Sequence, residues 1–216
     1  MSFLRASALA VCCAFASSAA AQSVVSNALV VPLHYTQISS GTYKLGIYAS
    51  LGGGAPQIFE FDTGGGGFYA AYASADPGKS DWWGSAFTNT GTGATNQYDS
   101  GIRYEGAIVA TAVSLYSDKH SPAPVVTTAP GALVGQMTSI SNTNTGQSLW
   151  TPGGEVGGQP PVDGAFYGDF GMSLVYAHNG IANLVAQLAF TNGVIPGFVV
   201  RAHGDSPHLQ IGLTTN

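Results

Sequence analysis

The residues of this chain best suited to chemistry lie in the segment 58–68, which reads Ile-Phe-Glu-Phe-Asp-Thr-Gly-Gly-Gly-Gly-Phe. Apolar residues lead into Asp62 and Thr63, and a run of glycines follows. A buried strand holds a carboxylate rigidly, while glycines let the main chain approach it closely. The pattern predicts that Asp62 is a working acid or base. A surface loop capped by an aspartate would show the same residue types.

Acid–base chemistry without a metal or a Ser or Cys nucleophile can use two carboxyl groups, one to polarise a water and one to donate a proton. The sequence around Asp62 suits it for one of these two roles, and it cannot fill both. The segment Asp99-Ser100-Gly101 follows Asp62 too closely for a separate folded unit to lie between them. This short separation favours a hairpin turn at Asp99-Ser100-Gly101. Asp163 and Asp169 lack a following Thr-Gly or Ser-Gly, so they are predicted to be turn residues.

Other chemistries have less support in the sequence. No Gly-Lys-Ser/Thr follows the glycine run, which argues against a phosphate-binding loop. His203 and His208 have no acidic or cysteine partner at ligand spacing. We therefore expect neither a metal nor a cofactor.

The elements that must position Asp62 are predicted to be short strands. Apolar and β-branched residues between turn signals predict strands over 29–35, 43–51 and 57–61. The pattern further predicts an irregular region over 64–101, a hairpin turning at 98–101, and loops with edge strands over 121–161. Apolar spacing over 181–190 predicts one short helix, and a final strand pair is expected over 197–202 and 209–213. The fold class is therefore all-β.

The first 21 residues read as a signal peptide, because a basic residue, an apolar run and an Ala-Ala-Ala cleavage pattern come in that order. Residues 22–216 are expected to form a single domain that is secreted or periplasmic, without a membrane span. Both cysteines, Cys12 and Cys13, lie in the leader. Loss of Arg5 leaves five basic and eleven acidic groups, a net charge of 5 minus 11, or −6, which makes nucleic acid an unsuitable partner.

Several segments together resemble the start of the pepsin-like aspartic proteases. The Asp62-Thr63-Gly64 triplet resembles the catalytic motif of that family, and Tyr98-Asp99-Ser100-Gly101 resembles its active-site flap. The segments 162–164 or 168–171, and then 184–212, resemble the later parts of the amino-terminal lobe. Other matching positions are Tyr43, Gly52, Pro56, Gln57, Phe59 and Gly106.

The resemblance implies one lobe of a fold that normally has two, a barrel-like β-lobe with one short helix. It implies that Asp62 is catalytic, that Thr63 and Gly64 support it, and that Tyr98, Ser100 and Gly101 contact a peptide substrate from the flap. The chain departs from the family where Gly65 and Gly66 replace the usual hydroxyl residues. The hydroxyl that would hydrogen-bond the catalytic carboxylate is therefore missing.

Three hypotheses follow from the sequence. The chain is a secreted aspartic endopeptidase unit that needs a second lobe, supplied by a homodimer or by the remainder of a longer protein, and its lobe-joining face is then expected to be apolar. Alternatively, it is an inactive relative that binds peptides, or an unrelated glycine-rich structural β-protein.

Overall fold

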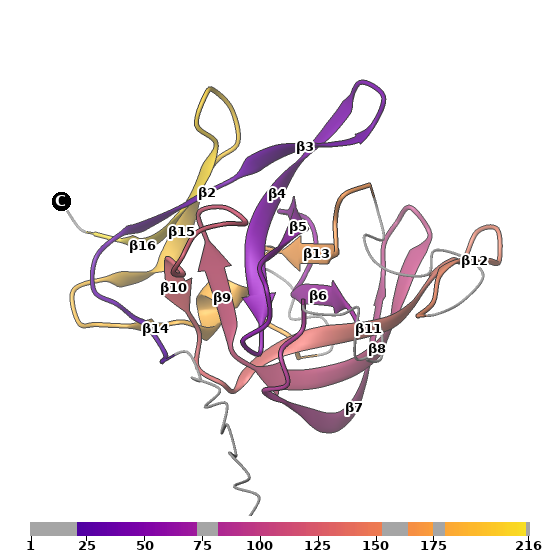
Figure 1. Cartoon of the computed structure of the whole chain (residues 1–216), viewed down its shortest axis with the longest axis horizontal. Coiled ribbons are helices and arrows are strands. Elements are labelled where there is room, and N and C mark those ends of the chain that lie inside the picture. The colour runs from indigo at the N-terminus through magenta and orange to yellow at the C-terminus, as the bar shows by residue number, and fades with distance from the viewer. Residues whose placement is uncertain (1–20, 73–81, 153–163, 175–179, 215–216) are drawn as a thin grey trace, which may run out of the picture.

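The computed structural model describes residues 21–72, 82–152, 164–174 and 180–214, and within these ranges the fold is all-β (Figure 1). The predicted leader and Asp163 lie outside the described residues. The first strands in chain order are β1 Val24–Val25, β2 Leu29–Pro32, β3 His34–Ser39, β4 Thr42–Leu51, β5 Gln57–Asp62, β6 Phe68–Ala71, β7 Phe87–Gln97 and β8 Ile102–Thr111. The later elements are β9 Val113–Tyr116, β10 Val126–Thr127, β11 Ala132–Asn142, β12 Gln147–Trp150, β13 Gly168–Gly171, η1 Leu184–Gln187, β14 Ala189–Phe190, β15 Ile195–Arg201 and β16 His208–Leu213.

Most strands belong to one large sheet. Its order is β10-β9-β4-β5-β13-β6-β11-β8-β7, with β3 paired to β4 and β12 paired to β11. Because β10 and β7 stand at opposite ends of this order, the sheet does not close on itself, and no closed barrel is found among the described strands. A second sheet, β15-β16-β2, packs beside it (Figure 1).

Strand β13 is inserted between β5 and β6, parallel to β5 and antiparallel to β6. In this register Asp169 lies beside Glu60 and Gly171 lies beside Asp62. A parallel neighbour cannot be reached by a tight turn, so the pairing joins segments far apart in the sequence. It sets the relative positions of Glu60, Asp62 and Asp169.

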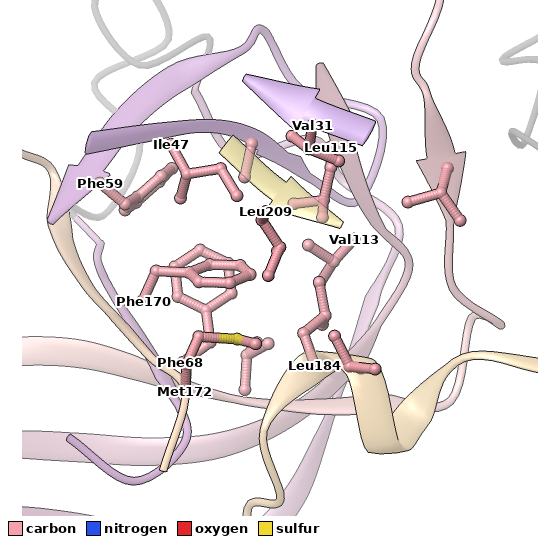
Figure 2. Close-up of a cluster of buried hydrophobic side chains, with 14 of the residues drawn as sticks. Val31, Ile47, Phe59, Phe68, Val113, Leu115, Phe170, Met172, Leu184 and Leu209 are labelled. Atoms are coloured by element: carbon pink, nitrogen blue, oxygen red, sulfur yellow. The ribbon is translucent and has the colours of Figure 1, made fainter. Parts of the chain in front are cut away.

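Alternation along β5 and β13 separates a core face from a polar face. Phe59, Phe61 and Phe170 point into the main core, and the period of two turns Glu60, Asp62 and Asp169 to the opposite side. Figure 2 shows Phe59, Phe68 and Phe170 gathered at one end of this core. The rings of Phe59 and Phe68 meet edge to face, with centroids 4.8 Å apart. The core thus anchors the two strands that carry the acids.

Three expectations about local structure were wrong. The region 64–101 contains β6 and β7, and β11 is an interior strand between β6 and β8 rather than an edge. In place of a helix over 181–190, the chain forms one 3₁₀ turn capped by Asn183 and then β14, which pairs with β1. The same apolar residues are still buried, so packing was satisfied without a full helix.

Trp82 and Trp83 are both buried, and both indole N–H groups donate to the Ala71 carbonyl at 2.8 Å. A shared backbone acceptor allows two adjacent tryptophans to be buried together. The described residues contain no helix long and apolar enough to cross a membrane.

Candidate active site

Asp62 ends β5 and is held in place by its own loop. The Gly64 N–H donates to Oδ1 of Asp62 at 2.7 Å, and the Met172 N–H donates to the Asp62 carbonyl at 2.7 Å. The side chain is partly exposed, so one oxygen is fixed while the group remains accessible.

Gly65 is the point at which two carboxylates converge. A Cβ placed on Gly65 would lie 2.8 Å from Oδ2 of Asp62 and 2.8 Å from Oδ2 of Asp169. These two oxygens are therefore at most 5.6 Å apart, twice 2.8 Å. A side chain at this position would need the space that the carboxylates of Asp62 and Asp169 occupy, so their approach requires glycine here.

Asp169 was predicted to be a turn residue, and that prediction was wrong. It lies inside β13, is only 3% exposed, and accepts a hydrogen bond at Oδ2 from the Tyr98 hydroxyl. Its Oδ1 has no hydrogen-bond partner within the described part of the chain. Burial raises the pKa of the Asp169 carboxyl well above its usual range; the Tyr98 hydrogen bond opposes this rise, and the charges of Asp62 and Glu60 reinforce it.

Tyr98 begins the turn of the β7–β8 hairpin, as the sequence predicts. The Tyr98 N–H donates to the Ile102 carbonyl at 2.8 Å, and Gly101 closes the turn with a φ of +86°. Burial raises the pKa of the Tyr98 hydroxyl, and the charge on Asp169 adds to the shift. The hydroxyl is therefore a permanent donor to Asp169. Its ring meets that of Tyr104 at 5.2 Å.

The hairpin tip is tied to the turn between β11 and β12. The Gly101 carbonyl accepts hydrogen bonds from the backbone and hydroxyl of Thr143, at 2.8 and 3.0 Å. The Ser100 carbonyl accepts one from Nδ2 of Asn144 at 3.2 Å. Both carbonyl groups are therefore hydrogen-bonded inside the protein, which ties the hairpin tip to the β11–β12 turn.

Two cavities meet at these residues. The larger, of about 470 Å³, is lined by Lys44, Glu60, Asp62, Tyr98, Ser100, Ile102, Tyr104, Ile140, Leu149 and Asp169. The smaller, of about 320 Å³, is lined by Gly64, Gly65, Gly66, Asn96, Gln97, Tyr98 and Asp99. Asn96 lines the smaller cavity and is 2% exposed, and its Nδ2 has no partner among the residues that the structure describes.

Of the six residues predicted for the site, Asp62, Gly64, Tyr98 and Ser100 line these cavities. Thr63 is exposed and lines neither cavity. Gly101 closes the β7–β8 turn instead of lining a cavity. Sequence reasoning missed Asp169, Glu60, Lys44 and Asn96. Glu60 could have been found, because it stands two positions before Asp62 on the same strand face.

Lys44 and Glu60 form an ion pair across neighbouring strands, with Nζ and Oε2 2.7 Å apart. Both side chains are about one-quarter to two-fifths exposed, so the pair adds little stability. In the cavity, the positive charge of Lys44 therefore offsets the negative charge of Glu60. Within the described ranges, no group of three or more His, Cys, Asp or Glu residues could hold a metal ion.

Comparison with known proteins gives a likeness to solved structures but no match by sequence. No family model and no curated protein matches the sequence. Among solved structures, the chain is similar to the aspartic proteinase from Irpex lacteus, with 16% sequence identity and a TM-score of 0.49. The match covers 88% of this chain and 49% of that protein, so the chain spans about half its length.

Proposed function

We propose that this chain is an aspartic endopeptidase unit, secreted or periplasmic, in which Asp62 is one of two catalytic carboxyl groups. The observation that carries the proposal is the mounting of Asp62. Its carboxylate lies at the end of a buried strand, accepts the Gly64 N–H at 2.7 Å, and opens into a cavity beneath Tyr98. A fixed, accessible carboxylate can take the proton of an attacking water.

The second carboxyl group is proposed to come from a second lobe or a second copy of this chain. Asp169 is poorly suited to that role because it is 3% exposed. It also pairs with Glu60, which comes two positions before Asp62 on β5, so it lies further than Asp62 from the end of the strand pair. Two like charges close together share a proton, which gives one acid and one base. An aspartate brought in above the partly exposed side of Asp62 meets this requirement.

The outer face of the β15-β16-β2 sheet supports such a partner. Val30 and Val199 both pair with Gln210 in this sheet, so all three side chains share one face. Val30 is 51% exposed and Val199 is 43% exposed, whereas Leu209 and Ile211 on the inner face are fully buried. Exposed valines on a flat sheet favour contact with another protein surface.

The test is hydrolysis of a quenched peptide library at pH 3 to 5 by the chain without its leader, over a range of concentrations. Asp62→Asn keeps the shape of the side chain and removes the titrating group, so we expect at least a thousandfold loss of rate, in line with removal of a general acid–base group. Asp205→Asn, an equal charge change on an exposed loop, is the matched control.

A rate that rises with the square of concentration would indicate a homodimer. Hydrolysis by Asp62→Asn within tenfold of the unchanged chain would refute the assignment. A chain that binds pepstatin and peptides without cleaving them at any concentration would instead favour the inactive peptide-binding relative.

A further inference from the structure

The larger cavity carries an excess of negative charge. Lys44 is held against Glu60 at 2.7 Å, so these two charges offset each other. Asp62 and Asp169 remain, with their Oδ2 atoms at most 5.6 Å apart, twice 2.8 Å. No other charged side chain lines this cavity in the described part of the chain. A ligand that enters it therefore meets two acidic groups and no unopposed basic one.

Asp169 is incomplete as a hydrogen-bonded group. Its Oδ2 accepts a hydrogen bond from the Tyr98 hydroxyl, but its Oδ1 has no partner among the described residues, although the residue is only 3% exposed. Buried polar atoms almost always have a partner, and a buried carboxylate without one is costly. Asp169 also lines the cavity, so a bound molecule can approach its carboxyl group.

The opposite part of the cavity wall is apolar. Ile102 and Tyr104 come from β8, Ile140 from β11 and Leu149 from β12. Long basic side chains bury a hydrocarbon stem against such surfaces and keep a charged head among polar groups. The cavity offers both surfaces within about 470 Å³, a volume typical of sites for small groups.

We propose that this cavity binds the basic side chain of a lysine or arginine in a peptide, and that Asp169 determines this specificity. The stem packs against Ile102, Ile140 and Leu149, and the cationic head lies against the carboxylate of Asp169. This inference rests on the proposed peptidase function for the identity of the ligand as a peptide. Because Asp169 and Asp62 converge on Gly65, the basic residue would lie next to the bond that is cleaved.

Binding should strengthen as pH rises. The groups that face Asp169 are Lys44 from β4, Glu60 and Asp62 from β5, Tyr69 from β6, Tyr98 from the hairpin turn and Tyr104 from β8. Burial raises the pKa of Asp169, so acid keeps it neutral and weakens its attraction for a cation. A lysine side chain stays charged throughout this range.

The experiment measures binding of two acetylated hexapeptide amides that differ at one position, lysine against norleucine, which has nearly the same stem without the charge. Isothermal titration at pH 4 and pH 7 uses the chain without its leader, Asp169→Asn and the control Asp205→Asn. At pH 7 we expect the unchanged chain and the control to bind the lysine peptide at least about tenfold more tightly than the norleucine peptide, as for a hydrogen bond to a charged group. Asp169→Asn should reduce the ratio to within twofold.

Equal binding of the two peptides by the unchanged chain at pH 7 would overturn the inference, and that comparison needs no variant to fold. Binding of neither peptide at millimolar concentration, or a lysine preference that survives Asp169→Asn or does not grow with pH, would also overturn it. These outcomes are separate from those of the Asp62→Asn hydrolysis assay. If that assay refutes the peptidase function while the lysine preference holds, the cavity remains a site for basic side chains.

Discussion

Replacement of Gly65 by alanine should disturb both carboxylates of the site directly. The added Cβ would lie 2.8 Å from one oxygen of Asp62 and 2.8 Å from one oxygen of Asp169, distances that real Cβ atoms do not show. Neither carboxylate can move freely, because Gly64 holds the first and Tyr98 holds the second. At least one of these hydrogen bonds must lengthen or break.

Forcing a methyl group into a packed site typically costs about 1–3 kcal/mol. For a domain of this size, each kcal/mol shifts the midpoint of thermal unfolding by about 2–4 °C, so Gly65→Ala should lower it by about 2–12 °C. Gly131→Ala is the matched control, because a Cβ there meets nothing within 4 Å. That change should be neutral or slightly stabilising, since alanine narrows the unfolded ensemble.

The assay is differential scanning fluorimetry of both variants at pH 7, followed by peptide hydrolysis and by the lysine–norleucine binding comparison. Gly65→Ala should also lose activity and the lysine preference, because the two carboxylates are pushed apart. The reasoning would be refuted if the two variants unfolded within 1 °C of each other and Gly65→Ala kept both properties.

Two further predictions concern the buried carboxyl. Tyr98→Phe keeps the ring contact with Tyr104 but removes the donor to Asp169, so it should cost about 1.5–3 kcal/mol in urea unfolding at pH 7; a loss under 0.5 kcal/mol would show that the hydroxyl adds no net stability. The raised pKa of Asp169 means that the folded state binds its proton more tightly than the unfolded chain does. The stability gained from this proton is fully present below the pKa of Asp169 in the unfolded chain, near 3.9. It is lost as pH rises through the pKa of Asp169 in the folded protein. Asp169→Asn should therefore gain stability relative to the unchanged chain as pH rises from 4 to 8. If the two proteins differ in their unfolding midpoint by the same amount at every pH, the raised pKa of Asp169 is contradicted.

The sequence determined the features that depend on neighbouring residues. Apolar and β-branched residues over 57–61 predicted the strand that leads into Asp62, and the glycines after it predicted the close approach of the main chain. The turn at Tyr98 and Gly101 was also predictable, because it needs a residue that accepts a positive φ. Each of these depends on local sterics and on a period that can be seen in a few residues.

The helix prediction failed because apolar spacing alone does not say which partner covers the residues. Ile181, Leu184, Val185 and Leu188 are all buried, but the backbone after Gln187 is extended, and Phe190 pairs with Val25. The Gln187 side chain bonds both backbone groups of Leu133, which fixes the single 3₁₀ turn against β11. Tertiary contacts thus outweighed a short helical pattern.

Only the tertiary structure decided the charge of the cavity. Asp62 and Asp169 are 107 positions apart, 169 minus 62, and nothing local distinguishes Asp169 from a turn residue. The parallel pairing of β13 with β5 turns Phe170 to the core and so turns Asp169 to the face of Glu60 and Asp62. Burial then raises the pKa of Asp169, and both the burial and the neighbouring charges arise from strands that meet only in the folded chain.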